Sequence, residues 1–268
     1  MDLRLRALQA LCTESPREKA ALAMALYAGA AELSLSPTAP VADSALPGRP
    51  ALPRLVHPAR VPRRSPANPA GLAALLHAIA HIELNAINLA LDAAWRFEGM
   101  PDAFHLDWVR VAAEEAYHFT LLVDHLATLG HQYGDFDAHD GLWAMCEKTA
   151  DDVVARMALV PRTLEARGLD ATPQIQDKLR QVGSPAALRA VEILDVILRD
   201  EVGHVAVGNR WYRWLCERDA LDPVAHYPLL VERYCAPRLY PPFNRAARLE
   251  AGFSEDELAW LVASVPRA

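Results

Sequence analysis

Two short motifs in the sequence combine a carboxylate and an imidazole at helical spacing. Glu115 and His118 lie in AAEEAYHFT, and Glu201 and His204 lie in RDEVGHVAVG. Side chains three residues apart share one face of an α-helix, so each motif presents its acid and its histidine together. One such pair alone is more often a solvated polar stripe than a binding site, because motifs this short are frequent by chance.

Each motif is preceded by a single glutamate within an apolar helical pattern. Glu83 stands in HIELNAI before the first motif, and Glu165 stands in TLEARG before the second. The order glutamate, then Glu-x-x-His, therefore occurs twice, with similar spacing in both halves. Each half predicts a pair of helices, with one carboxylate on the first helix and a carboxylate–imidazole pair on the second.

This doubled pattern indicates a dinuclear metal site. Four carboxylates and two imidazoles are the ligands that a pair of iron or manganese ions needs inside a helical bundle. Unpaired carboxylates in apolar helices would be costly without a compensating positive charge. A zinc protease would show His-Glu-x-x-His on one helix, a motif that this sequence lacks. Order, spacing and apolar surroundings together favour metal ligands over unrelated surface acids.

Glu165 is the least secure of these residues from spacing alone. Glu147, Asp151 and Asp152 lie in the same predicted helix, and we expect all three to be exposed. Pro161 favours Glu165, because a proline kink often lies beside a functional turn of a helix.

Several polar neighbours have other interpretations. Glu114 is expected to point outward, about 100° around the helix from Glu115. Tyr117 is expected to be a packed tyrosine rather than a redox residue. Asp195 and Asp200 are candidates to orient an imidazole of the second motif.

A second polar stripe lies on the helix of Glu83. It consists of His81, Asn85, Asn88 and Asp92. Buried polar groups need partners, so we expect these side chains to form hydrogen bonds between helices, with pocket lining as the alternative.

The sequence resembles the ferritin-like di-iron carboxylate superfamily. The matching segments are VAAEEAYHF, LEARG and RDEVGH, and the tail PPFNRAARLEAGFSEDE is similar to an uncharacterised ferritin-like branch, itself distantly related to the bacterial tRNA methylthio-isopentenyl-adenosine hydroxylase. The resemblance covers about residues 70–260 and implies an all-α, ferritin-like four-helix bundle. The metal ligands that it implies are Glu83, Glu115, His118, Glu165, Glu201 and His204. It implies no substrate.

Four long helical patterns have to position these ligands. We expect helices at about 70–98, 102–129, 140–168 and 184–219, with a short helix at 173–182. Capping residues and glycines set the ends: Asn68 and Pro69 open the first pattern, and Gly99, Gly130 and Gly168 end the first three. Two or three short helices follow, the last opened by a capping box from Ser254 to Glu257.

The N-terminal part differs in composition. Residues 16–34 predict a helix with Ser15 as N-cap, and residues 36–69 are rich in proline and arginine. Such a segment favours an extended strap along an acidic surface, with an anion or partner contact through its arginines (Arg49, Arg54, Arg60, Arg63 and Arg64) as the alternative. The predicted division is 1–69 for the N-terminal helix and arm, 70–220 for the bundle and 221–268 for a C-terminal helical extension packed on it.

Composition limits the class of protein. The 268 residues carry a formal net charge of −7, which argues against nonspecific binding to DNA or acidic membranes. The four cysteines are far apart and are expected to be buried thiols of a reducing compartment. The sequence shows no signal-peptide pattern and no long uninterrupted apolar run, so a cytoplasmic protein that does not span a membrane is expected.

These observations favour a non-haem di-iron oxidoreductase that uses dioxygen to hydroxylate or oxidise an organic substrate. Its cofactors would be two iron ions, with a manganese–iron pair as a variant. The expected partners are a small-molecule or modified-nucleoside substrate and a reductase that donates electrons to a monomer or homodimer. The alternatives are a ferritin-type ferroxidase or metal-handling protein, and a metal-stabilised protein without turnover.

Overall fold

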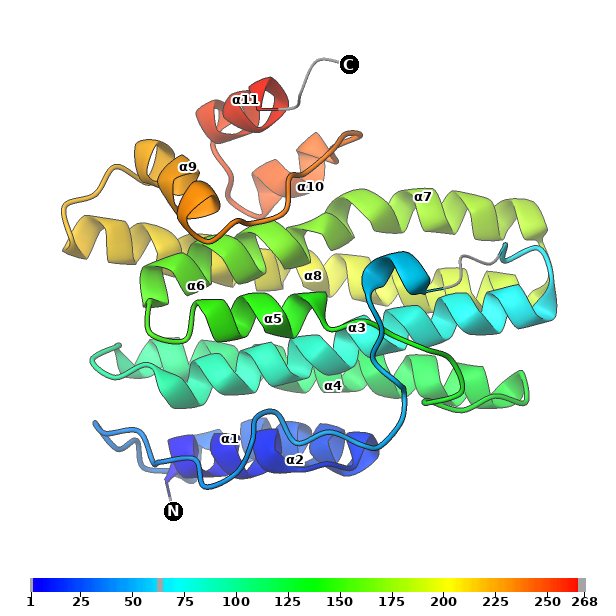
Figure 1. The fold of residues 1–268 in the computed structure, drawn as a ribbon, viewed down its shortest axis with the longest axis horizontal. Helices are drawn as coiled ribbons and strands as arrows, with labels where there is room; N and C mark the ends of the chain where they lie inside the picture. Colours follow the sequence, from blue (N-terminus) through cyan, green and yellow to red (C-terminus); the bar gives the residue numbers. More distant parts are fainter. Residues whose placement is uncertain (1, 62–64, 265–268) are drawn as a thin grey trace. The chain divides into compact units, whose positions relative to one another are not determined.

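The computed structural model describes residues 2–61 and 65–264, and these residues are mainly helical (Figure 1). They contain no β-strand, only isolated bridges between Asp2 and Ser34 and between Leu55 and Ala138. The predicted all-α class is confirmed. The α-helices are α1 (Leu3–Cys12), α2 (Pro16–Ala28), α3 (Pro69–Arg96), α4 (Asp102–Thr128), α5 (Gly141–Lys148), α6 (Val153–Leu159), α7 (Ala166–Val182), α8 (Pro185–Arg218), α9 (Pro223–Arg233), α10 (Arg245–Glu250) and α11 (Glu255–Ala263).

The chain folds into two compact units. One comprises Met1–Trp143 and Lys178–Ile193, and the other comprises Ala144–Asp177 and Leu194–Ala268. The predicted division into 1–69, 70–220 and 221–268 stays a prediction.

In the first unit, α3 and α4 run side by side, as Figure 1 shows, with α2 packed on α4 and α1 on α3. The Asn68 side chain caps α3 by accepting a hydrogen bond from the Gly71 amide, and Pro69 occupies its first turn, as the sequence predicts. Helix α1, which the sequence analysis did not predict, begins after Asp2, whose side chain accepts from the Leu5 amide.

Helix α3 has the length and apolar composition of a helix that could cross a membrane, and 72% of its most apolar window is buried inside the protein. It is the one helix with those properties among the described residues. Such burial is what the core helix of a water-soluble protein also shows.

The proline-rich arm pairs its arginines with acids, as the strap interpretation predicts. Arg49 lies 2.7 Å from Asp140, and Arg54 lies 2.6 Å from Asp137. Leu55 and Ala138 form an isolated bridge beside these pairs. Arg63 and Arg64 lie outside the described residues.

The region predicted as one helix from 140 to 168 is broken in the second unit. Helices α5 and α6 are separate, and a π-helix, η3 (Val160–Glu165), joins α6 to α7. Pro161, where the sequence predicts a kink, lies in this π-helix, which is a local widening of the helical turn. The predicted stop at Gly168 and the separate helix at 173–182 are wrong. Helix α7 runs through both Gly168 and Pro173.

The termini of the other helices follow their local signals. The Ser15 cap, the Pro185 start and the capping box of Ser254 and Glu257 are all present. The cysteines are free thiols, but the expectation that all are buried is wrong, because Cys12 is half-buried and Cys235 is exposed.

A buried lysine ties the N-terminal helices to the arm and to α3. Nζ of Lys19 donates to the Asn88 side-chain oxygen at 2.5 Å and to the Gly48 carbonyl at 2.8 Å. Burial, helped by the nearby charge of Arg49, lowers the pKa of Lys19 from 10.5 to about 7. The folded protein therefore binds this proton more weakly than the unfolded chain does.

Lys19→Met is expected to destabilise the protein by about 1–3 kcal/mol, because it leaves one buried and one partly buried acceptor without their donor. The folded state binds fewer protons than the unfolded state between the lowered pKa, about 7, and the ordinary 10.5, so the lysine favours folding more as pH rises through this window. Urea unfolding at several pH values should show the loss growing with pH. The control is Arg17→Met, at an exposed ion pair of the same helix. A loss independent of pH would contradict this account.

Gly208→Ala is expected to lower the melting temperature. An added Cβ would stand 2.6 Å from side-chain atoms of Pro161, whose ring cannot move without moving η3. Overpacking of this kind costs about 1–3 kcal/mol. Gly203→Ala in the same helix is the control, since nothing lies within 4 Å of its added Cβ. Its melting temperature should be unchanged or raised, because alanine favours a helix over glycine by about 1 kcal/mol. Equal melting of the two variants would show that η3 is not held by this contact.

Candidate metal centre

The first unit brings together the residues predicted for the first half of the metal site. Glu83 comes from α3, and Glu115 and His118 come from α4; each offers a ligand atom, and these atoms lie within 4.8 Å of one another. All three side chains are buried, with Glu115 only 1% exposed. We call Glu83, Glu115 and His118 the first half-site.

In the first half-site two buried carboxyl groups, of Glu83 and Glu115, lie against one imidazole, that of His118, and this arrangement shifts their pKa values. Burial and the neighbouring charge of Glu115 raise the pKa of Glu83. Burial opposes protonation of His118, but its hydrogen bonds to Glu115 and Glu83 outweigh burial and raise its pKa. Protons therefore compensate the carboxylates, and a divalent cation bound here would have to displace them.

The distances in the first half-site suit a metal ion. Nδ1 of His118 lies 3.3 Å from Oε2 of Glu83 and 3.3 Å from Oε2 of Glu115. Hydrogen bonds between ionised groups are shorter, about 2.7–2.9 Å. Ligands about 2.1 Å from one ion, at angles of about 90–109°, stand about 3.0–3.4 Å apart. Both observed distances fall in that range, and the ligand types fit iron or manganese.

The second unit carries the other three predicted residues, Glu165, Glu201 and His204, which we call the second half-site. Nδ1 of His204 lies 3.3 Å from Oε2 of Glu201, the same separation as in the first half-site. Both are buried, as is Glu165. A Cβ added to Gly168 would stand 3.5 Å from a Glu201 carboxylate oxygen. Glu201 therefore faces the turn that follows Glu165.

Glu165 stands at the end of the π-helix η3, and among the described residues the groups that could hold a metal ion do not include it. Glu165 is the last residue of η3, and α7 starts at Ala166. Widened turns of this type occur often at functional sites, because they change the direction in which a few side chains point. The competing acids of the same region differ in burial: Glu147 and Asp151 are exposed as expected, and Asp152 is half-buried and caps α6.

Two of the neighbouring residues test the predicted helix faces. Glu114 is half-buried and pairs with Arg110 on its own helix, so its outward direction is confirmed. The expectation that Tyr117 is packed is wrong, because Tyr117 is 47% exposed. It lies two positions after Glu115, on the outer side of α4.

Asp195 and Asp200 were candidates to orient an imidazole. Asp195 accepts a hydrogen bond from Gln176, and Asp200 pairs with Arg199. Their role towards His204 stays a prediction.

The second polar stripe of α3 forms hydrogen bonds: Asn88 bonds to another helix, as the main interpretation predicts, whereas His81 bonds to the loop after α4. His81 contacts the Tyr133 hydroxyl at 2.7 Å and the His139 carbonyl at 3.1 Å, and Asn88 accepts from Lys19. Asp92 instead pairs with Arg96 on its own helix. Burial lowers the pKa of His81 to about 4, so its ring is neutral at physiological pH.

Sequence reasoning missed Tyr133, whose hydroxyl contacts the His81 ring of α3. Its ring stacks on His77 at 5.2 Å and packs edge-on against Phe119, the residue after His118. The neutral His81 ring donates from Nε2 to the His139 carbonyl, so its Nδ1 accepts the Tyr133 hydroxyl proton. Tyr133 sits in a loop without helical periodicity, which is why the pattern of the sequence gave no signal for it.

Comparison with known proteins places the chain in a family. The family model described as "Protein of unknown function (DUF455)" matches residues 12–259. An "Uncharacterized protein" of Haemophilus influenzae (strain ATCC 51907 / DSM 11121 / KW20 / Rd) is 53% identical over 221 residues, which cover 79% of this chain and 75% of that protein. No solved structure matches. The chain therefore belongs to the DUF455 family.

Proposed function

We propose that the protein is a non-haem di-iron oxidoreductase that uses dioxygen to hydroxylate or oxidise an organic substrate. The observation that carries the proposal is the buried first half-site, in which two carboxylates stand 3.3 Å from one imidazole nitrogen. The repetition of the 3.3 Å carboxylate–imidazole spacing in the second half-site supports a site for two ions. The all-α fold and the doubled sequence pattern are in keeping with a ferritin-like bundle.

Each group has a definite part in this proposal. His118 and His204 would each give one nitrogen ligand, and the four glutamates would supply negative charge for two divalent cations. Two ferrous ions held by these residues would supply electrons for the reduction of dioxygen. That the two half-sites join around one pair of ions stays a prediction of the sequence order.

The surroundings of the first half-site affect both the access of water and the binding of a cation. Its side chains are almost completely buried, so bulk water is largely excluded and electrostatic interactions are strong. The carboxylates bind a cation only after His118 and Glu83 release their protons, so metal affinity should fall as pH falls. The proposal includes a cytoplasmic location, a reductase partner and a small-molecule or modified-nucleoside substrate.

Ferrous loading tests the proposal directly. Under anaerobic conditions each chain should bind about two ferrous ions. When oxygen is then admitted, the amount of oxygen consumed should be proportional to the amount of bound iron. The loaded protein should melt several degrees higher than the metal-free protein, because cations remove the repulsion between buried carboxylates. Elemental analysis, an oxygen electrode and a melting series measure these outcomes. One ion or none, or no oxygen uptake, contradicts the proposal. If the protein instead forms a large assembly that takes up far more iron than its ligands can bind, an iron-storage function is favoured.

Glu115→Gln is expected to lower iron content strongly, because it removes a negative charge that lies against His118. Glu114→Gln is the matched control, since Glu114 lies one position away and pairs with Arg110 instead. Its iron content should stay close to that of the unchanged protein. Elemental analysis after identical ferrous loading compares the two variants, and melting temperatures check that both remain folded. Equal iron loss in both variants would show that the assignment of helix faces is wrong.

A further inference from the structure

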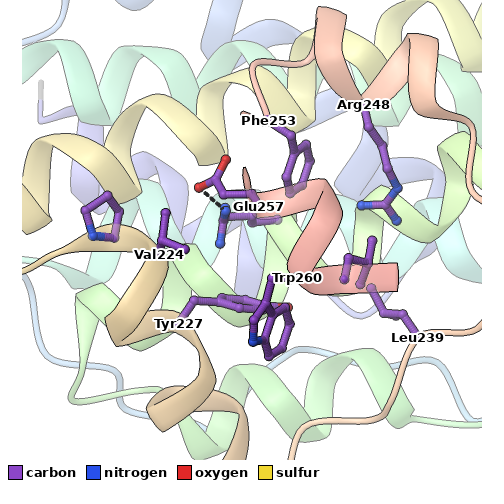
Figure 2. A pocket seen from close by; sticks show the side chains of 10 residues that line it. Val224, Tyr227, Leu239, Arg248, Phe253, Glu257 and Trp260 are labelled. Carbon is purple, nitrogen blue, oxygen red and sulfur yellow. Dashed lines mark hydrogen bonds and ion pairs between the residues drawn. The ribbon is translucent and has the colours of Figure 1, made fainter. Parts of the chain in front are cut away.

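The second unit contains a narrow cleft at its C-terminal helices, shown in Figure 2. The space that a water molecule can enter is about 20 Å³, within about 360 Å³ of empty volume that includes open solvent. The walls come from η3, α9, α10, α11 and the loops beside them. Tyr227, Trp260, Leu239 and Phe253 line this space, and Figure 2 shows Tyr227 and Trp260 lying against one another. The rings of Tyr227 and Trp260 meet edge to face at 5.3 Å. The walls are therefore mainly aromatic and aliphatic.

Arg162 on η3 places a buried cation in this apolar cleft. It is only 3% exposed, and its guanidinium carbon lies 4.8, 4.7 and 5.0 Å from the ring centres of Tyr212, Tyr227 and Phe253. These rings cover the faces of the guanidinium group, so further ligands can reach only its edge.

Some of the N–H donors along the edge of the Arg162 guanidinium group already have hydrogen-bond partners. Its Nε donates to the Asn209 side-chain oxygen at 2.8 Å, and its Nη2 pairs with Glu257, the interaction drawn as a dashed line in Figure 2. Its Nη1 is buried and has no hydrogen-bond partner among the described residues. A buried donor left in this way costs free energy until an acceptor reaches it.

The charges around the cleft leave a positive excess. Glu257 is shared, since its carboxylate also pairs with Arg213 at 3.0 Å and accepts from the Ser254 amide at 2.7 Å. Arg248, which lines the cleft, pairs with Asp170 at 2.6 Å. Three arginines thus face two carboxylates, and one of the three, Arg213, pairs with Glu257 from outside the cleft lining.

We propose that this cleft binds the carboxylate of a slender organic acid. One carboxylate oxygen would accept from Nη1 of Arg162, and the apolar body would lie along Tyr227, Trp260 and Leu239. A carboxylate fits better than a phosphate, because the cleft is narrow, its walls are apolar and one buried donor is available. Such an acid supplies an acceptor for Nη1 of Arg162 and a second negative charge beside that of Glu257.

This site uses none of the predicted metal ligands, so its test is separate from that of the proposed function. The two sites are nonetheless linked along the chain, because Arg162 and Glu165 belong to the same six-residue π-helix. A ligand held by Arg162 would hold the segment that carries Glu165.

The test compares octanoate, octan-1-ol and inorganic phosphate as probes of the full chain. Calorimetry and tryptophan fluorescence report binding, the second because Trp260 lines the cleft. Octanoate should bind with a Kd of about 1 mM or tighter, and octan-1-ol at least about tenfold more weakly. Equal binding of the acid and the alcohol overturns the role of Arg162. Displacement of octanoate by an equal concentration of phosphate overturns the role of the apolar walls.

A pair of charge variants locates the site without altering Arg162 itself. Leu239→Glu places a negative charge on the wall of the cleft and should weaken octanoate binding at least about tenfold. Tyr240→Glu adds the same charge one residue away, at a side chain that is 63% exposed and does not line the cleft. It should change the Kd by less than about twofold. Equal weakening in both variants, or none in either, overturns the assignment of the cleft.

Discussion

Burial of two carboxylates beside one histidine is the constraint on which the first unit depends. Glu83 and Glu115 can ionise inside the protein only where positive charge is held against them, and His118 is the base that both contact. Holding this arrangement requires that α3 and α4 lie side by side along their length, which their apolar faces accomplish. The long apolar character of α3 is thus explained by its place in a core, against α1, α2 and α4.

The second unit contains a buried positive charge, the guanidinium group of Arg162. Arg162 is enclosed by aromatic rings and held by Glu257 and Asn209. It stands on the same π-helix as Glu165, so one widened turn places a cation and an acid in different surroundings. Gly208 permits this turn, since its missing side chain leaves the space that Pro161 fills. A regular α-helix would present residues 162 and 165 on one face.

The sequence predicts those features that depend on neighbouring residues. Caps at Ser15, Asn68 and Ser254 are local hydrogen bonds, and periodic apolar residues show which side of α4 carries Glu115. Local signals fail where distant contacts decide. Gly168 has the composition of a helix end, yet α7 continues through it beside Glu201.

Other features were beyond a periodic pattern. Tyr133 gave no signal because a loop has no repeat, and the exposure of Tyr117 was misjudged because an aromatic residue was assumed to be packed.

Glu115 and His118 share a helix, so their 3.3 Å separation follows from an i, i+3 spacing. Glu83 comes from another helix and yet stands at the same 3.3 Å from the same nitrogen. Helical geometry cannot impose that equality, so the packing of α3 on α4 sets it. Two carboxylates at equal distances from one imidazole nitrogen are an arrangement that suits a cation shared by all three groups.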